Sequence, residues 1–174
     1  MRSIIQISEW PPDAVEELVR ESESEGFRFL KRLREEWLSG ANRFSNAGEA
    51  FFGVIEEGRL LAVGGINRES EACGRLRRFY VKKEARRSGV GRSLARHIVA
   101  FASSHYTRVV LRTDTEAADR FYVSLGFARL SKSELATHLL ELKKEPNQSL
   151  EPTPPAVTPR AAARVAPAGV VAHL

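Results

Sequence analysis

The sequence predicts an α/β (α+β) domain in which a mixed central sheet is flanked by helices. Its hydrophobic period is helical over residues 12–38, strand-like over 50–81 and helical again from 90 to 101. A turn that contains two glycines joins the strand-like run ending at Val81 to the helical run after it. Another short strand follows that helix, and a strand–helix–strand order of these lengths predicts a crossover between parallel strands.

The N-terminal part is expected to form one strand and two helices. A short strand is expected around residues 4–7, where three isoleucines occur. A first helix is expected to begin at 11–13, where a proline precedes an acidic residue, and its apolar pattern ends near 22–26. A second helix covers 27–38, and Gly40 is a suitable C-terminal stop. The apolar positions expected on its buried face are Phe29 or Leu30, Leu33 and Trp37.

The middle of the chain predicts a hairpin, a third strand and a helix. Two apolar runs in 50–67 lie on either side of the polar turn Glu56-Glu57-Gly58, which is typical of an antiparallel hairpin. The strand 76–81 follows, and three antiparallel strands therefore precede the glycine turn. The helix after the turn is expected to pack on the sheet through one stripe, formed by Val90, Leu94, His97 or Ile98, and Phe101.

The last elements are a strand at 106–111, a helix at 117–125 and two further strands at 127–130 and 137–142. Thr113 and Glu116 have the spacing of a capping box that opens this helix, and Gly126 ends it. From residue 146 the composition changes to Pro, Ala and Val. We therefore expect one domain in 1–145 and a Pro/Ala-rich, disordered tail in 146–174, since closely spaced prolines prevent helices and strand ladders.

Composition excludes several classes of protein. A single cysteine, Cys73, excludes an internal disulfide and a cysteine metal cluster, and it is expected to be a small buried hydrophobe. The four histidines show no metal-ligand spacing, so no metal is predicted. No apolar run approaches the roughly 20 residues of a membrane span, and no long apolar signal segment opens the chain. A cytoplasmic location is expected.

Positive charge is concentrated in one segment. The chain has 27 basic and 22 acidic residues, and residues 75–96 contain nine of the basic ones against Glu84 alone. The remainder therefore has 18 basic and 21 acidic residues. Such a patch attracts a phosphorylated ligand. The alternative is a solvated basic face without a ligand.

The turn at 86–91 has the features of a phosphate-binding loop. Gly89 and Gly91 allow the backbone to approach a ligand, and the amides of a helix's first turn have no partners within the helix. The sequence has neither the Gly-Lys-Ser/Thr of a nucleotide triphosphatase nor the Gly-x-Gly-x-x-Gly of a dinucleotide fold there.

Two motifs give the chain a resemblance to a known family. The first is Arg-x-x-Gly-x-Gly at 86–91, after a strand that ends in Val81. The second is Ala118-x-x-Phe121-Tyr122-x-x-Leu125-Gly126-Phe127, about 30 residues later. Together they resemble the GNAT superfamily of N-acetyltransferases, over roughly residues 50–142.

The resemblance implies how acetyl-CoA binds. The two parallel strands that end near Val81 and Leu111 are expected to splay, with the acyl-CoA arm between them. The backbone at 79–81 would bind the pantetheine arm and support the thioester oxygen, and 86–91 would hold the pyrophosphate. The residues expected to bind the cosubstrate on this basis are Phe79, Tyr80, Val81, Arg86, Arg87, Ser88, Gly89, Val90, Gly91, Arg92, Thr115, Ala118 and Phe121.

Tyr122 matches the family tyrosine that donates a proton to the departing coenzyme A thiolate. A positioned phenol suits this task because its pKa in solution lies above that of the thiol. The alternative is that Tyr122 only packs beside Phe121.

The chain departs from the family pattern at three places. Thr115 replaces a frequent asparagine, and Lys83 and Arg87 replace a frequent proline and glycine. The strand before the loop carries Arg77 and Arg78 where members that act on ammonium substrates often have a glutamate. Four carboxylates are alternative bases acting through water, and Glu71 is chosen among Glu49, Glu56, Glu69 and Glu71.

The expected function is N-acetyl transfer from acetyl-CoA to a primary amine by direct attack in a ternary complex. The alternative is a non-catalytic module that senses acyl-CoA or binds nucleic acid. The expected partners are acetyl-CoA and a small-molecule or peptide amine, with a homodimer left open. Neither a membrane nor a nucleic acid is an expected partner of the enzyme.

Overall fold

The computed structural model describes residues 1–10, 12–131 and 135–143. The strands are β1 (Arg2–Gln6), β2 (Ala50–Glu56), β3 (Arg59–Ser70), β4 (Cys73–Val81), β5 (Arg108–Leu111), β6 (Ala128–Arg129) and β7 (His138–Glu141). The helices are α1 (Pro12–Ser24), α2 (Phe29–Ser39), α3 (Val90–Ser103) and α4 (Glu116–Ser124), with one 3-10 turn, η1 (Lys83–Ala85). Every element predicted within these residues is present.

The strands form one mixed sheet in the order β1-β2-β3-β4-β5-β7-β6. The first four strands pair antiparallel, β4 and β5 are parallel, and β7 lies antiparallel between β5 and β6. Glu57 and Gly58 take the positive φ of the tight turn between β2 and β3, at 51° and 77°. The predicted fold class, a mixed central sheet with one parallel crossover, is confirmed.

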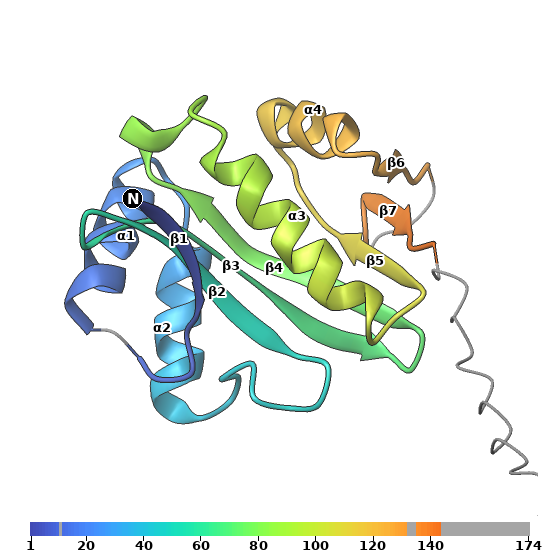
Figure 1. Ribbon diagram of the computed structural model, residues 1–174, viewed down its shortest axis with the longest axis horizontal. Coiled ribbons are helices and arrows are strands. Elements are labelled where there is room, and N and C mark those ends of the chain that lie inside the picture. The colour runs from blue at the N-terminus through green and yellow to red at the C-terminus, as the bar shows by residue number, and fades with distance from the viewer. Residues whose placement is uncertain (11, 132–134, 144–174) are drawn as a thin grey trace, which may run out of the picture.

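The helices cover the two faces of the sheet (Figure 1). The first two, α1 and α2, share one buried cluster with side chains of β2, β3 and β4, including Phe51 and Tyr80. On the other face α3 and the residues after it pack in a second cluster, which includes Leu94, Tyr122 and Phe127. Each face of β4 therefore contacts a different pair of helices.

The buried stripes settle the alternatives that helical periodicity left open. On α2 the buried residues are Leu30, Leu33 and Trp37, so Leu30 and not Phe29 completes the stripe. Gly40 ends this helix in the left-handed conformation, and its N–H donates to the Trp37 carbonyl at 3.2 Å. On α3 the residue on the stripe is Ile98, because His97 is exposed.

The start of α4 differs from the predicted capping box. Thr115, two residues after Thr113, is the N-cap, and its hydroxyl accepts from the Ala118 amide at 3.3 Å. Thr113 lies before the helix: its amide donates to the Thr137 hydroxyl at 3.0 Å, and its own hydroxyl lies 3.5 Å from the Thr115 amide. The helix therefore begins at Glu116, and Gly126 follows its end with φ of 97°.

Several expectations concern the chain as a whole. The predicted tail, 146–174, lies outside the described residues. Within the part described, no helix is long and apolar enough to cross a membrane. Cys73 is buried against Val110 and Ala136, as expected for a small hydrophobe. Over residues 1–10, 12–131 and 135–143 there is no group of three or more histidine, cysteine or carboxylate side chains that could hold a metal ion.

Leu33→Ala tests the packing of α2 on the sheet. Leu33 is fully buried, so the lost contacts and the cavity are expected to lower the free energy of unfolding by about 2–5 kcal/mol. The control is Leu38→Ala on the same helix, where the side chain is 63% exposed and almost no change is expected. Chemical denaturation of both variants measures the difference, and equal stability would show that α2 does not pack as described.

Candidate functional site

The parallel strands β4 and β5 are paired over only part of β4. Residues 73–75 of β4 pair with residues 108–110 of β5. Beyond Arg75 the ladder stops, while β4 continues to Val81 with β3 on its other edge. The strands diverge from there toward the loop before α3 and toward α4 (Figure 1). The edge of β4 from Leu76 to Val81 is therefore without a strand partner on the β5 side.

A β-bulge lies in the same stretch of β4. Val63 pairs with Tyr80 and Gly65 with Arg77, so β4 has one more residue than β3 between these pairs. Arg78 takes a positive φ of 57°, which is uncommon for a residue other than glycine. After the bulge, Phe79 packs in the cluster of α3 and α4, and Tyr80 in the cluster of α1 and α2.

The loop from Arg86 to Gly91 presents a run of free amides. The backbone N–H groups of residues 87–92 have no hydrogen-bond partner within the described part of the chain. Arg87 and Gly89 have positive φ values of 64° and 84°. No acidic residue occupies the first turn of α3, and no side chain caps it. These amides and the helix dipole favour an anion at this end of α3.

The two glycines of the loop have different roles. A Cβ added at Gly89 would meet no atom within 4 Å, so this position faces open space. A Cβ added at Gly91 would lie 3.1 Å from Cγ2 of Val81 and 3.5 Å from the Phe121 ring. Gly91 therefore allows α3, β4 and α4 to approach one another, while Gly89 keeps the loop surface clear.

Much of the basic segment is neutralised by carboxylates from other elements. Arg86 pairs with Glu25 of α1, donates from Nε to the Val81 carbonyl at 3.0 Å and lies over the Tyr80 ring. The pairs that join this segment to α1, α2 and β3 are Arg86–Glu25, Lys82–Glu17, Arg78–Glu36 and Arg75–Glu69. The side chain of Arg86 thus fixes the loop to α1, and Arg87 and Arg92 remain exposed at the loop.

Tyr80 also fastens β4 to α1. Its hydroxyl lies 2.6 Å from a carboxylate oxygen of Glu25 and 2.9 Å from one of Glu21. Burial and these two carboxylates raise the pKa of Tyr80 well above its usual range. Its backbone, not its side chain, is what remains for a ligand at the edge of β4.

Tyr122 lies on α4 within a cluster of aromatic rings. Its ring centroid is 5.1 Å from Phe121, 5.6 Å from Phe127 and 6.1 Å from Phe79 of β4. Tyr80 and Tyr106 each donate a hydrogen bond, but the Tyr122 hydroxyl has no partner among the described residues. Burial raises the pKa of Tyr122, so its phenol stays protonated near neutral pH. The structure brings Tyr122, Phe121 and Phe79 together beside the open edge of β4.

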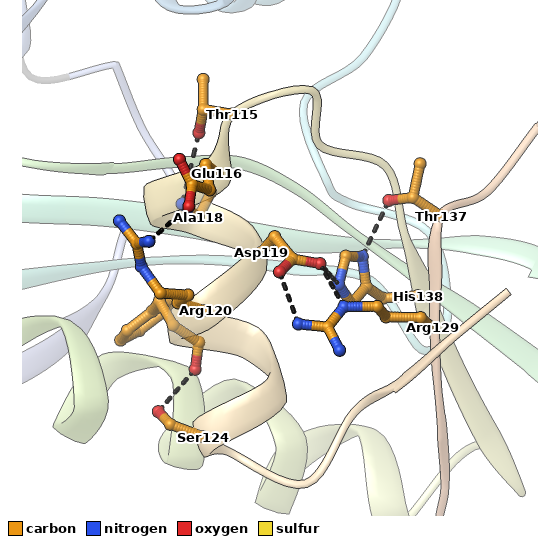
Figure 2. Close-up of polar contacts among 10 residues, drawn as sticks. Thr115, Glu116, Ala118, Asp119, Arg120, Ser124, Arg129, Thr137 and His138 are labelled. Atoms are coloured by element: carbon orange, nitrogen blue, oxygen red, sulfur yellow. Dashed lines mark hydrogen bonds and ion pairs between the residues drawn. The ribbon is translucent and has the colours of Figure 1, made fainter.

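A polar network holds α4 against the strands after it (Figure 2). Asp119 accepts two hydrogen bonds from Arg129, at 2.8 and 2.7 Å, and lies 3.0 Å from Nε2 of the buried His138. Nδ1 of His138 is 2.8 Å from the Thr137 hydroxyl. The hydrogen bond from Arg129 lowers the pKa of Asp119 to about 2. Because the His138 ring also contacts Tyr122, at 6.2 Å between centroids, this network fixes the tyrosine's position.

Thr115 lies at the start of α4, above Ala118 in Figure 2. Both Thr115 and Asp119 line a hollow of about 350 Å³ between α4 and the strands β6 and β7. The Thr115 hydroxyl accepts from the Ala118 amide, so it is already engaged as a helix cap. Thr115 therefore contributes first to the position of α4.

Glu71 does not lie with the other predicted residues. It occupies the turn between β3 and β4, at the opposite end of β4 from Val81, and lines a hollow with Ala72 and residues 103–107. The choice of Glu71 as a base is therefore not carried further, because the turn separates it from Tyr122 and the loop. A carboxylate that the sequence did not single out, Glu36 of α2, lies 2.7 Å from Arg78 of β4. The two residues are 42 positions apart, so no local pattern pointed to this pair.

Comparisons with known proteins agree with this geometry. A family model described as the acetyltransferase (GNAT) family matches residues 11–127. A protein from Exiguobacterium sp. 255-15, classed as an acetyltransferase, has a solved structure that is 32% identical, with a TM-score of 0.72. That match covers 81% of this chain and 93% of the other.

More distant proteins share the fold. The ribosomal-protein-S18-alanine N-acetyltransferase from Escherichia coli is 16% identical with a TM-score of 0.62, over 85% of this chain and 98% of its own.

In sequence, N-acetylaspartate synthetase from Danio rerio is 33% identical over 91 residues, which are 50% of this chain and 32% of that protein. The same enzyme from Xenopus tropicalis is 32% identical over 50% of this chain and 34% of its own length. The chain thus spans about a third of the curated relatives it matches.

Glu25→Gln tests the attachment of the loop to α1. The hydrogen bond from Arg86 lowers the pKa of Glu25 from 4.5 to about 2, so the ionised carboxylate stabilises the fold above pH 4.5. This contribution is lost as the pH falls toward 2. We expect the variant to be less stable by about 1 kcal/mol near neutral pH. The difference from wild type should shrink between about pH 4.5 and 2.5 in denaturation curves. A difference independent of pH would contradict the ion pair.

Proposed function

This chain belongs to the GNAT family of acetyltransferases, and from that membership we propose that it transfers the acetyl group of acetyl-CoA to a primary amine. The family implies an acyl-CoA donor. The open edge of β4 is suited to the amide-containing pantetheine arm, and the free amides of residues 87–92 are suited to the diphosphate. Arg87 and Arg92, both exposed, add positive charge at that end.

The proposed reaction is direct attack in a ternary complex. The amine, after losing one proton from its ammonium form, attacks the thioester carbon through its lone pair. A C–N bond forms, the C–S bond breaks, and the sulfur leaves with the electron pair of that bond. Tyr122 donates its phenolic proton to the sulfur, and one of the two protons on the attacking nitrogen returns to Tyr122 or passes to solvent. The products are an amide and free coenzyme A.

The observation that carries the proposal is the unpartnered hydroxyl of Tyr122. Tyr122 is 6% exposed, and its oxygen is not one of the fully buried polar atoms that lack a partner. The hydroxyl is therefore accessible and free to donate to the sulfur of the donor. The raised pKa of Tyr122 keeps the proton available for it.

The names of two relatives bear on the acceptor. The two curated relatives are named for making N-acetylaspartate, which is an acetylated amino acid. A small acceptor with an amino group is therefore favoured over a peptide. The alternative of a nucleic-acid-binding module is less favoured, because four of the nine basic residues in 75–96 are paired with carboxylates.

Tyr122→Phe tests the proton donor. Loss of the phenolic proton is expected to lower kcat by about 100-fold or more, while acetyl-CoA still binds. The matched control is Tyr106→Phe. The Tyr106 hydroxyl donates to the Gly48 carbonyl at 2.8 Å and lies away from the proposed site. Release of the free thiol from acetyl-CoA with an amine panel measures both. Unchanged kcat in Tyr122→Phe would remove Tyr122 from the reaction.

Gly89→Leu tests the phosphate loop. A side chain here would occupy the space that the diphosphate needs, so acetyl-CoA should no longer raise the melting temperature. Gly58→Leu is a matched control, because Gly58 also has a positive φ, 77° against 84°, and also faces open space. Both variants carry similar backbone strain. If acetyl-CoA stabilised the two equally, the loop would not be the binding site.

A further inference from the structure

A part-buried ion pair beside the open edge of β4 is only half satisfied. The Arg78 side chain is 8% exposed, and its Nη2 donates to Oε1 of Glu36 at 2.7 Å. Nε of Arg78 and Oε2 of Glu36 are also buried, and neither has a hydrogen-bond partner within the described residues. One unsatisfied donor and one unsatisfied acceptor thus occur in the same pair.

Such an arrangement is costly for the folded protein alone. A buried polar atom without a partner costs about 1–3 kcal/mol, and more when it belongs to a charged group. A partly satisfied buried network is worse than an apolar core of the same shape. A ligand that offers an acceptor to Arg78 and a donor to Glu36 would remove both costs. A carboxylate and an ammonium are the groups with these properties.

Arg77 adds positive charge next to this pair. It is half-buried and makes no hydrogen bond to any described residue. Burial, followed by the neighbouring charge of Arg78, lowers the pKa of Arg77. The flanking Arg75 is neutralised by Glu69, and Arg78 by Glu36. The group therefore carries one uncompensated positive charge, which favours a ligand with a net negative charge.

The bulge places this group next to the proposed reaction centre. Arg78 contacts α2, whereas the next residue, Phe79, lies on the opposite face of the sheet. There the Phe79 ring is 6.1 Å from the Tyr122 ring between centroids. A ligand at Glu36 and Arg78 would thus approach the edge of β4 from the face opposite Tyr122. Such a ligand would lie across β4 from the phenol proposed to protonate the leaving sulfur, close to a thioester held along that edge.

We propose that Glu36, Arg77 and Arg78 form the acceptor subsite and that the acceptor is an acidic amino acid. This inference rests on the proposed function. Oε2 of Glu36 receives the ammonium, Nε of Arg78 receives one carboxylate, and the free guanidinium of Arg77 receives the second. Glu36 supplies from α2 the carboxylate that β4 itself lacks.

Direct binding is the first test. L-Aspartate is titrated into the protein by calorimetry, with and without coenzyme A, for wild type, Arg77→Gln and Arg32→Gln. Arg32 is an exposed residue of α2 outside the proposed subsite and serves as the control. Arg77→Gln is expected to weaken binding about 10- to 100-fold, the range for a hydrogen bond to a charged group, and Arg32→Gln to leave it unchanged. Equal affinities for all three proteins, or no binding of L-aspartate to the wild type, would overturn the subsite.

A second variant separates the two ends of the ligand. Glu36→Gln retains the size of the side chain but loses the charge that receives the ammonium. It should bind L-aspartate at least tenfold more weakly and bind succinate, which has no amino group, no more weakly than wild type. Arg77→Gln should weaken both ligands. Equal losses for both ligands in Glu36→Gln would contradict the assigned orientation, and circular dichroism of each variant checks that it is folded.

Turnover distinguishes failure of the subsite from failure of the proposed function. With acetyl-CoA, kcat/KM should decrease in the order L-aspartate, L-alanine, L-alaninamide. Equal values for the three amines would overturn the subsite and leave the acetyltransferase activity standing. If no amine is acetylated and acetyl-CoA does not stabilise the protein, the proposed function fails, and the calorimetric titration without coenzyme A still decides whether the subsite exists.

Discussion

The position of the proposed site depends on one feature of the sheet: the hydrogen-bonded ladder between the parallel strands β4 and β5 stops after three residues. Three residues of β4 pair with β5, and the six that follow have β3 on one side only. Backbone amides and carbonyls need partners, and the proposed ligand, with polar groups in a row, would supply them along this edge. The free loop amides lie at one end of this gap in the sheet, and Tyr122 lies beside it. The proposed ligand would contact all three.

In the proposed reaction the two faces of β4 have different roles: one supports the strand and the loop, and the other carries Tyr122. On the face of α1, the carboxylates of Glu17, Glu21 and Glu25 bind Lys82, Tyr80 and Arg86, which holds the end of β4 and the following loop in place. On the other face α4 positions Tyr122, and the contact of Asp119 with His138 fixes α4 in turn. The half-satisfied pair of Arg78 and Glu36 lies at the β-bulge of β4, on the face that α1 and α2 cover. A ligand can therefore act at β4 without disturbing its support.

Local sequence patterns were sufficient to predict most of the fold and part of the site. The stop at Gly40, the turn at Gly58 and the glycine loop before α3 depend on neighbouring residues, and all three were predicted. The Arg86–Glu25 and Arg78–Glu36 pairs join residues 61 and 42 positions apart, and no local pattern contains that information. For the same reason the charge of residues 75–96 looked like one patch in the sequence. The α4 cap lies at Thr115, and the amide of Thr113 donates instead to Thr137, 24 positions away in the chain.

The most direct test of the central claim is an amide-resolved NMR titration of the protein with coenzyme A. If the gap in the sheet and the loop after it hold the ligand, the largest shifts will be those of residues 87–92 and of the open edge of β4, 76–81. The amides of β1 and β2, on the far side of the sheet, will remain unchanged. Shifts confined to the hollow between α4 and β7, or spread over the chain without a maximum at β4 and its loop, would contradict the account.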